Sequence, residues 1–453
     1  MSRTLERLRE GQIPRNFDWN DQNYSSVPLV VSHPSEPTPE KALKVKFVAE
    51  DLRDGLHGVP RYPSLEEMVD YVAALDELKI DIMTVGIYSG LGNKVDRTIK
   101  GLLDVMKKDF PQVTPIVLTL TTQDSLNWTK DCKEINPRLN AIVFMGTAPH
   151  RLLVEEWEKD FIINRLAWAT NQMVKEEVEV IGATEHTTQT PPDFLREIVK
   201  VQVDNGAKYF CIADTIGIAR PKGAYRITSY VRRILDGMGA NDVLIDWHGH
   251  RDMGNDVSNA MAALAAGADR VHTVARGIGE RAGNAQMEAV MLNLRRILDT
   301  YGLESPWRTE KLEDVLKAYN RMTNVPVTSH GPLSERSHTT SLGIHAAAML
   351  KAKRLESEAK ELGGEENGKL ADELNALYQT IYTSVPPGWV GKEHEIRIGP
   401  SSGKGNVELA AILAGIDPKS ISSKTIELIL TYAAEAGREL EPEEFMRLLN
   451  DRH

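Results

Sequence analysis

Two histidines separated by one glycine, His248 and His250, follow an apolar run at residues 243–247. In an extended strand, residues i and i+2 point to the same side. We therefore expect both imidazoles to project from the end of one strand, where they can share a divalent cation. A carboxylate and an amide oxygen from elsewhere in the chain would complete a mixed nitrogen and oxygen coordination shell.

A suitable carboxylate follows an earlier apolar segment. Arg53 and Asp54 come just after residues 45–50, which have the composition of a buried strand. If both strands end at the same rim, Asp54 reaches the cation held by His248 and His250. Arg53 is permanently cationic and suits an enolate or a carboxylate. The residues alone leave a second interpretation open, because Arg-Asp pairs are also common in surface turns.

A glycine-rich turn at residues 277–284 ends in Asn284 and leads into a predicted helix. Glycines let the backbone approach a ligand closely, and the N-terminus of a helix favours anionic groups. Asn284 can supply the amide oxygen of the metal shell. It can equally act as a helix cap, and the sequence does not decide between the two.

The elements that must position these residues alternate regularly between strand and helix patterns. Each apolar segment is followed by an amphipathic stretch of helical period. Eight such pairs predict an α/β fold, a closed (β/α)₈ TIM barrel over residues 44–302, in which chemistry lies at the C-terminal strand ends. The predicted strands are 45–50, 80–86, 114–120, 141–146, 178–183, 209–214, 243–247 and 270–275.

Three further segments flank the predicted barrel. Residues 1–43 are expected to form an N-terminal arm, irregular where proline, serine and asparagine are frequent. Residues 303–375 are expected to form a helical subdomain or linker, including a charge-rich helical hairpin at 351–375. Residues 376–453 are expected to form a C-terminal subdomain with two closing helices.

Composition limits the classes of partner. A formal net charge of −11 argues against nonspecific binding to nucleic acid, which requires a basic surface. No apolar run reaches the length of a membrane span, and the charged N-terminus lacks the apolar core of a signal peptide. The chain contains only 2 cysteines, so no disulfide framework is implied. We expect a cytoplasmic protein without nucleic-acid or membrane partners.

Three separated motifs together resemble the DRE-TIM metallolyase superfamily. The resemblance is closest to its acyl-CoA-dependent synthases, which form 2-isopropylmalate, homocitrate or, in the Re-type enzymes, citrate. It extends beyond the barrel into segments that resemble the subdomains following the barrel in the synthases. The barrel motifs are 52–55, 248–250 and 277–284, and the later segments are 342–345, 382–391 and 398–404.

The resemblance implies a metal centre and an anion-stabilising arginine. The divalent cation would be Mg²⁺, Mn²⁺, Zn²⁺ or Co²⁺, since two histidines with oxygen donors suit all four. Arg53 would stabilise the enolate oxygen of the incoming acyl thioester. The implied metal ligands are Asp54, His248, His250 and Asn284.

The resemblance also assigns roles outside the metal centre. Glu185 corresponds to an acid that assists catalysis, and Thr215 to a threonine that contacts the substrate. His345 corresponds to a histidine that the partner subunit contributes near the acyl-CoA, where it is a candidate base. Tyr382 corresponds to a tyrosine of the synthases. A homodimer that completes its active site with the partner's residues is therefore implied.

The implied reaction is a Claisen-type condensation of acetyl-CoA, as co-substrate, with a 2-oxo acid. A base removes a methyl proton from acetyl-CoA, and the enolate attacks the ketone carbon of the 2-oxo acid. Hydrolysis of the thioester then releases CoA and makes the condensation effectively irreversible. The product would be a 2-alkylmalate, a homocitrate or a citrate-type tertiary alcohol.

The chain departs from the synthase pattern at several positions. Leu56 and His57 replace the usual Glu-Gln pair after Arg-Asp-Gly, and His57 resembles the base of 4-hydroxy-2-oxoacid aldolases, although it equally suits a lining role in substrate binding. Thr84 replaces an acidic residue that shapes the 2-oxo acid pocket. His186 replaces an aspartate beside Glu185, and Thr340 stands where many synthases have a histidine. These departures leave the identity of the 2-oxo acid open.

Two other function classes are kept beside the synthase. One is a metal-dependent carbon–carbon lyase or aldolase acting on an acyl-CoA or a 2-oxo acid; its aldolase form depends on His57. The other is a descendant without activity that binds a metal and a carboxylate ligand. About fifty residues follow Gly403, too few for the leucine-sensing domain of many isopropylmalate synthases, so feedback control by such a domain is not expected.

Overall fold

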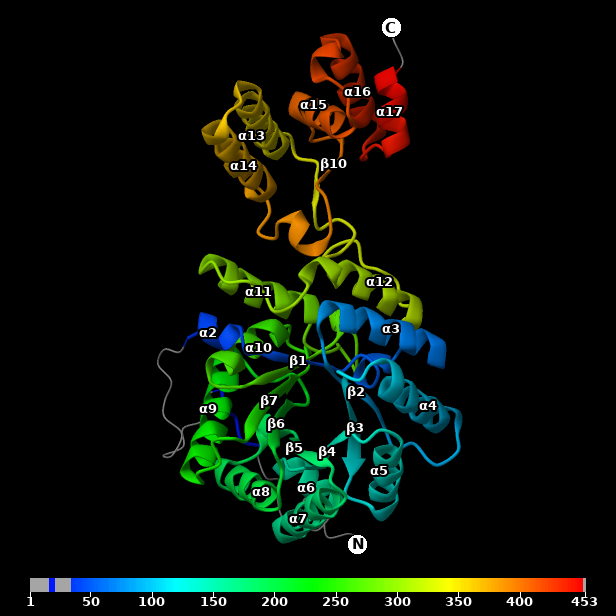
Figure 1. Ribbon diagram of the computed structural model, residues 1–453, viewed down its shortest axis with the longest axis vertical. Helices are drawn as coiled ribbons and strands as arrows, with labels where there is room; N and C mark the ends of the chain where they lie inside the picture. Colours follow the sequence, from blue (N-terminus) through cyan, green and yellow to red (C-terminus); the bar gives the residue numbers. More distant parts are fainter. Residues whose placement is uncertain (1–15, 21–33, 451–453) are drawn as a thin grey trace, which may run out of the picture. The chain divides into compact units, whose positions relative to one another are not determined.

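Eight parallel strands close into a barrel in the first of the chain's two units (Figure 1). The structure, a computed structural model, describes residues 16–20 and 34–450 and divides the chain into residues 1–326 and 327–453. Neighbouring strands follow the chain order, and β1 pairs with β8 to complete the ring. The predicted TIM barrel is therefore confirmed. The strands are β1 Lys46–Ala49, β2 Ile82–Ile87, β3 Thr114–Leu120, β4 Asn140–Gly146, β5 Glu179–Glu185, β6 Tyr209–Asp214, β7 Leu244–Gly249 and β8 Arg270–Thr273.

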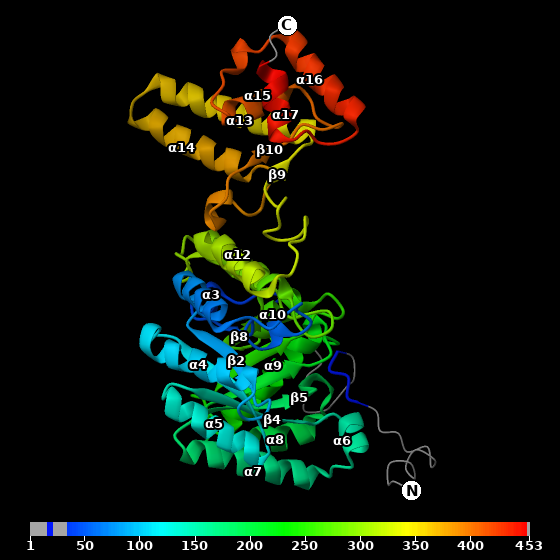
Figure 2. The same cartoon turned by 90° about the vertical axis from the view of Figure 1, so that its right-hand side faces the viewer.

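Helices surround the barrel on its outer side (Figures 1 and 2). Helix α3 illustrates why they form where they do. Ser64 and Glu67 make a reciprocal capping box at its start, and Met68, Val72 and Leu75 lie on its buried face. The helices of this unit are α2 Pro39–Ala42, α3 Leu65–Leu78, α4 Lys94–Asp109, α5 Gln123–Ile135, α6 Pro149–Glu155, α7 Lys159–Lys175, α8 Pro192–Asp204, α9 Pro221–Gly237, α10 Asp256–Ala265, α11 Met287–Thr300 and α12 Leu312–Thr323.

The last of these helices, α12, anchors the loop that follows β1. The hydroxyl of Tyr319 donates a hydrogen bond of 2.6 Å to the carbonyl oxygen of Gly55, and its ring packs 5.4 Å from that of Tyr71. The first unit therefore extends to residue 326, beyond the barrel end expected at residue 302. This contact fixes the backbone next to Arg53 and Asp54.

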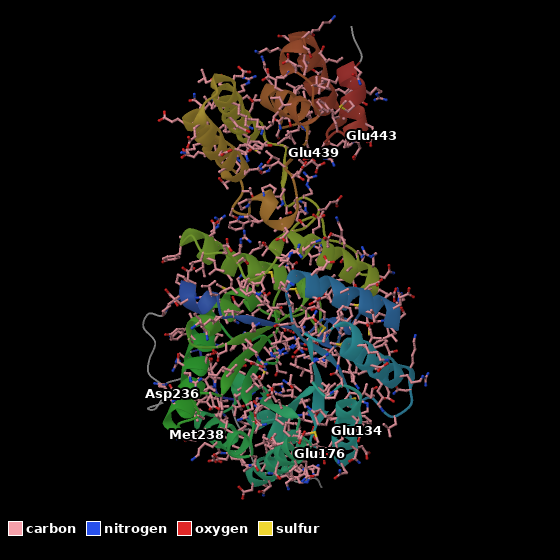
Figure 3. All side chains as sticks on the ribbon, viewed as in Figure 1. Glu134, Glu176, Asp236, Met238, Glu439 and Glu443 are labelled. Atoms are coloured by element: carbon pink, nitrogen blue, oxygen red, sulfur yellow. The ribbon has the colours of Figure 1, made fainter. Side chains whose placement is uncertain are left out.

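The barrel interior is packed with side chains rather than open, and Figure 3 shows them filling the ring. One part is an apolar cluster that includes Ile116, Ile142 and Ile181. Another part is charged: Arg270 makes two hydrogen bonds to Asp246, at 2.7 and 2.6 Å. The two hydrogen bonds between the partners, and the contact of Asp246 with His272 at 3.2 Å, stabilise an ion pair at this depth.

Part of the predicted N-terminal arm packs against the barrel. Trp19 is buried and its indole nitrogen donates to the carbonyl of Thr190 at 3.1 Å. Arg226 in turn donates to the carbonyl of Trp19 at 3.0 Å. The rest of the predicted arm at residues 1–15 and 21–33 lies outside the described residues.

The second unit contains the predicted helical hairpin. It consists of α13 Gly343–Leu362 and α14 Glu365–Thr380, with a turn at residues 363–364 between them. Three helices follow instead of the two expected, because Gly437 ends α16 in a left-handed turn and a separate α17 begins five residues later. The remaining elements are β9 Thr339–Thr340, β10 Glu395–Ile396, α15 Lys404–Leu413, α16 Ser423–Ala436 and α17 Pro442–Asn450. Within the described part of the chain, none of the helices is long and apolar enough to span a bilayer.

Candidate active site

A cavity of about 430 Å³ lies at the C-terminal ends of the barrel strands. This is the rim where TIM barrels carry their chemistry. The cavity brings together seven of the predicted site residues, which come from the ends of β1, β5, β6 and β7. They are Arg53, Asp54, His57, Glu185, Thr215, His248 and His250.

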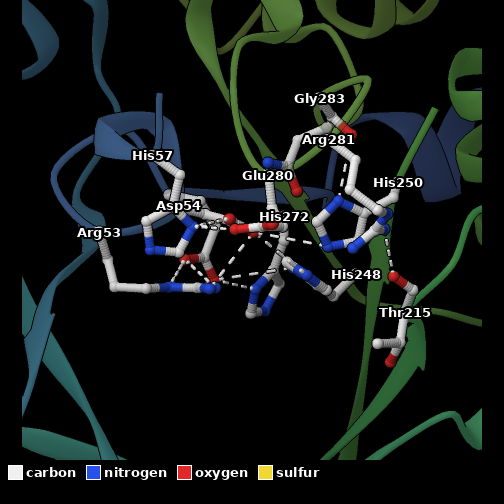
Figure 4. A network of polar contacts seen from close by, with 12 residues as sticks. Arg53, Asp54, His57, Thr215, His248, His250, His272, Glu280, Arg281 and Gly283 are labelled. Atoms are coloured by element: carbon white, nitrogen blue, oxygen red, sulfur yellow. Dashed lines mark hydrogen bonds and ion pairs between the residues drawn. The ribbon is translucent and has the colours of Figure 1, made fainter. Parts of the chain in front are cut away.

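Three of these residues form a cluster with the spacing of a metal site (Figure 4). Oδ2 of Asp54 lies 3.6 Å from Nε2 of His248 and 3.6 Å from Nε2 of His250. Ligands bound at about 2.1 Å from one cation lie roughly 3 to 3.5 Å from each other. The predicted trio is therefore close enough to share a single ion.

The buried oxygens of the site show whether these residues fit a metal. Among the described residues, both carboxylate oxygens of Asp54 and Oδ1 of Asn284 are buried without accepting a well-formed hydrogen bond. Buried acceptors are normally satisfied, and although Arg53 and His57 lie 3.3 and 3.2 Å from the Asp54 carboxylate, these oxygens can still accept a further partner. A divalent cation is the partner that this donor set suits.

Asn284 is held against His250 by the glycine-rich turn. The two residues form an isolated backbone bridge, and Asn284 is 1% exposed. A Cβ atom at Gly279 would lie 2.0 Å from Nδ2 of Asn284, so the turn can pass this close only with glycine there. Asn284 is not among the cavity-lining residues.

Both histidines are prepared to act as neutral ligands. Burial lowers the pKa of His248 to about 3, and burial also lowers the pKa of His250. Nδ1 of His250 lies 3.1 Å from the carbonyl of Gly283, which can only accept a hydrogen bond. The proton therefore resides on Nδ1, and the Nε2 lone pair faces Asp54.

Arg53 is held by an acid on each side. Its guanidinium contacts Oε2 of Glu50 at 2.6 Å and Oδ2 of Asp54 at 3.3 Å. Burial opposes the ionisation of both acids, but Arg53 and the neighbouring histidines together outweigh it and hold the pKa of each carboxyl well below its usual range. Arg53 is thus fixed at the cavity wall.

His57 bridges two acids at the mouth of the cavity. Its Nδ1 lies 3.2 Å from Asp54 and 3.1 Å from Glu280. The contact with the Asp54 carboxylate raises the pKa of His57. His57 therefore lines the site, as one of its two predicted roles requires.

Glu185 and Thr215 lie on the wall formed by β5 and β6. Burial raises the pKa of Glu185, which ends β5. The hydroxyl of Thr215 accepts a 2.7 Å hydrogen bond from the backbone N–H of His186. His186 itself is in a left-handed conformation, with φ at 60°, and is not among the cavity-lining residues.

The other two predicted catalytic residues, His345 and Tyr382, lie in the second unit and contact each other. Their rings stack with centroids 4.0 Å apart and planes 22° from parallel. His345 is in the first turn of α13, and Tyr382 follows α14. The helical hairpin therefore brings together two residues that are 37 positions apart, from 345 to 382.

Sequence reasoning missed two buried residues on the cavity wall. Glu50 follows β1 and His272 is in β8; their side chains meet at 2.6 Å, and His272 also contacts Asp246 at 3.2 Å. Burial lowers the pKa of His272, but the two carboxylates outweigh it and raise the value overall. A charged or titratable residue at the end of, or inside, a predicted buried strand was the available signal.

The chain belongs to the HMGL-like family, whose model matches residues 44–318. More particularly, it belongs to the synthase branch of the DRE-TIM metallolyase superfamily, as the motifs predicted. It is 28% identical over 381 residues to the 2-isopropylmalate synthase of Methanocaldococcus jannaschii, an alignment that covers 81% of this chain and 62% of that protein. It is 26% identical over 310 residues to the 2-isopropylmalate synthase of Sulfolobus acidocaldarius, covering 68% of this chain and 76% of that enzyme.

The match to curated relatives is partial in length. The probable 2-isopropylmalate synthase of Methanopyrus kandleri is 29% identical over 321 residues, which are 68% of this chain and 58% of the relative. The chain thus spans about 60% of the length of the Methanopyrus and Methanocaldococcus proteins.

Solved structures agree on the fold. The HMG-CoA lyase of Brucella melitensis superimposes with a TM-score of 0.51 at 15% identity, covering 62% of this chain and 99% of the lyase. The hydroxymethylglutaryl-CoA lyase of Pseudomonas aeruginosa gives 0.51 at 16% identity, covering 65% of this chain and 96% of the lyase. At such identities the likeness concerns the barrel alone.

Proposed function

We propose that this protein condenses acetyl-CoA with a 2-oxo acid and hydrolyses the thioester, releasing CoA and a 2-alkylmalate-type acid. The observation that supports this most is the Asp54, His248 and His250 cluster beside Arg53 in one cavity. It combines a site for a divalent cation with a fixed cation for an enolate. The names of the relatives, 2-isopropylmalate synthases, support the same reaction class.

In this proposal, Asp54, His248 and His250 hold the divalent cation, with Asn284 as a fourth ligand. Mg²⁺, Mn²⁺, Zn²⁺ and Co²⁺ all suit these donors. When bound, the cation supplies Lewis-acid polarisation of the ketone carbonyl of the 2-oxo acid. His250 is kept in the correct tautomer by the Gly283 carbonyl, which orients it for this task.

Arg53 stabilises the negative oxygen of the acetyl-CoA enolate. Its fixed position between two acids means that no side chain must reorganise as that charge develops. Thr215 and His57 contact the 2-oxo acid from opposite sides of the cavity, and Glu185 assists proton transfer. Burial raises the pKa of Glu185, which favours its protonated form and suits a group that takes part in proton transfer.

We further propose that His345 removes the methyl proton of acetyl-CoA and that Tyr382 orients its imidazole by stacking. The enolate carbon then bonds to the ketone carbon, the resulting alkoxide takes up a proton, and water hydrolyses the thioester. In a homodimer these two residues would serve the barrel of the partner subunit. The two cysteines are free and buried, which is compatible with work in a reducing cytoplasm.

The test is release of free thiol from acetyl-CoA by the purified protein with Mg²⁺ or Mn²⁺. Pyruvate, 2-oxoisovalerate, oxaloacetate and 2-oxoglutarate are supplied one at a time. We expect thiol release that requires both the 2-oxo acid and the metal. A rate that is the same without any 2-oxo acid, or no release with any of them, would contradict the proposal.

A second candidate, a pyruvate-forming aldolase, is favoured by one observation: His57 contacts Asp54 at 3.2 Å, where a base could serve a metal-held substrate. It predicts pyruvate from a 4-hydroxy-2-oxo acid without CoA. Measuring pyruvate in the same preparation separates the two activities, since only the aldolase produces it.

A further inference from the structure

The cavity wall has a polar side and a mostly apolar side. The prospective metal ligands come from the loops and strands around β1 and β7. The wall contributed by β2 to β6 is mostly apolar. The residues that give it this character are Ile87, Leu118, Ile142, Phe144, Ala183 and Cys211. A 2-oxo acid held by its carboxylate and ketone on the metal side leaves its own side chain to face this apolar wall.

The cations that line the cavity are already paired. Arg281 contacts both oxygens of Asp252, at 2.9 and 3.2 Å, and donates to the carbonyl of Thr215 at 2.5 Å. His57 lies between Asp54 and Glu280. A second carboxylate on the substrate would need a free cation, because burying an unpaired charge is strongly unfavourable.

Arg53 is the remaining cation that could pair with a second substrate carboxylate, and Glu50 already binds it. Its Oε2 accepts from two guanidinium nitrogens of Arg53, at 3.0 and 2.6 Å. The same carboxylate accepts from the hydroxyl of Thr84 at 2.5 Å and contacts His272 at 2.6 Å. Glu50 is 1% exposed. Its three partners lie in β2 (Thr84), in β8 (His272) and in the loop after β1 (Arg53). It therefore cannot turn away to free the Nε and Nη2 edge of the guanidinium for a substrate carboxylate.

We propose that Glu50 is a specificity-determining residue that restricts this site to 2-oxo acids with uncharged side chains. The inference rests on the proposed function and adds the class of substrate to it. Glu50 acts in two ways: it takes up the Nε and Nη2 edge of Arg53, where a second substrate carboxylate would make a two-point contact, and it places a negative charge on the wall that this carboxylate would approach. Rejection of a substrate by an unpaired buried charge is a strong basis for selectivity.

The first test compares substrates on the unaltered protein. The kcat/KM for thiol release is measured with pyruvate, 2-oxobutyrate and 2-oxoisovalerate, and with oxaloacetate and 2-oxoglutarate. We expect the best uncharged substrate to exceed both dicarboxylates by at least tenfold. A dicarboxylate that reacts equally well or better overturns the inference and leaves the proposed condensation intact. If none of the five 2-oxo acids leads to thiol release, the proposed function is refuted, and the inference with it.

The second test is Glu50→Gln, which keeps the side-chain shape and removes the charge. We expect the ratio of dicarboxylate to uncharged substrate in kcat/KM to rise at least tenfold, even if both rates fall. The matched control is Glu288→Gln, another buried glutamate, whose carboxylate accepts from Gln286 and from the backbone of Arg276 and does not line the cavity. That control should leave the ratio unchanged.

The ratio of the two kcat/KM values separates a change in selectivity from damage to the fold, because damage to the fold lowers both values together. An unchanged ratio in folded Glu50→Gln overturns the role of Glu50. Should Glu50→Gln fail to fold, inhibition of the unaltered enzyme by 2-oxoglutarate decides the matter. An inhibition constant of 2-oxoglutarate against pyruvate that is similar to the KM of pyruvate contradicts the inference. An inhibition constant at least tenfold higher than that KM supports it.

Discussion

Oδ2 of Asp54 lies 3.6 Å from Nε2 of His248, although the two residues follow the first and seventh strands of the chain. Closure of the barrel causes this approach, because β8 pairs with both β1 and β7. The geometry of the site therefore depends on contacts between segments that are distant in the chain.

The glycine-rich turn is expected to control Asn284. In Gly279→Ala, the new methyl group would lie 2.0 Å from the Asn284 amide, which must then move. Since residues that position a metal site typically change its affinity 10- to 100-fold, we expect the Kd for Mn²⁺ to rise by about tenfold or more. Titration of the metal-free protein with Mn²⁺ measures this. Gly302→Ala, at a glycine with no atom near its Cβ position, is the control; an unchanged Kd in Gly279→Ala would show that Asn284 does not bind the metal.

The buried acid Asp51 should make stability fall as pH rises. Burial raises the pKa of Asp51 to about 7, against hydrogen bonds from Ala275 and Tyr71 that lower it, whereas the unfolded chain titrates near 3.9. Between these values only the folded protein keeps the proton, so the free energy of unfolding decreases from about pH 4 to pH 7. At pH 8 the buried charge costs about 4 kcal/mol by this difference.

The variant Asp51→Asn keeps the oxygen that accepts from Ala275 and removes the titration. Its free energy of unfolding in urea should exceed that of the unaltered protein by about 2 to 4 kcal/mol at pH 8, with a much smaller gap at pH 4. Asp242→Asn, at an exposed position, serves as control. A gap independent of pH would show that Asp51 does not hold a proton in the folded protein.

Removal of the imidazole of His345 should separate metal binding from chemistry. We expect His345→Ala to keep its metal content and to lose 10²- to 10⁴-fold in thiol release, the usual contribution of a general base. His330→Ala, an exposed histidine in the same unit, should lose neither. Turnover within threefold of the unaltered enzyme in His345→Ala would remove this residue from the mechanism.

Much of this arrangement was predictable because it depends on periodicity. The strand ends follow from apolar runs, and the i, i+2 spacing of His248 and His250 already places both imidazoles on one side. Glu50 could not be assigned in this way. Its role depends on the register of β1 against β2 and β8, which brings Thr84 and His272 to its carboxylate. Pairing register arises from packing of the whole barrel and is not written in any local pattern.

In the second unit, the sequence identified two candidate residues but not the contact between them. The resemblance to the synthases singled out both His345 and Tyr382, but only the folded hairpin stacks their rings at 4.0 Å. Three helices lie after the hairpin where two were expected, and a left-handed Gly437 separates α16 from α17. Such a break depends on a single residue and leaves the surrounding helical pattern intact.

The central claim is that Asp54 and the two histidines hold one divalent cation on which turnover depends. The direct measurement is the metal content of the purified protein after exposure to Mn²⁺ and dialysis, alongside thiol release, for the unaltered chain and for Asp54→Ala and His250→Ala. We predict about one ion per chain in the unaltered protein, with both metal and turnover lost in each variant. One bound ion retained in both variants, with turnover unchanged, would contradict the account.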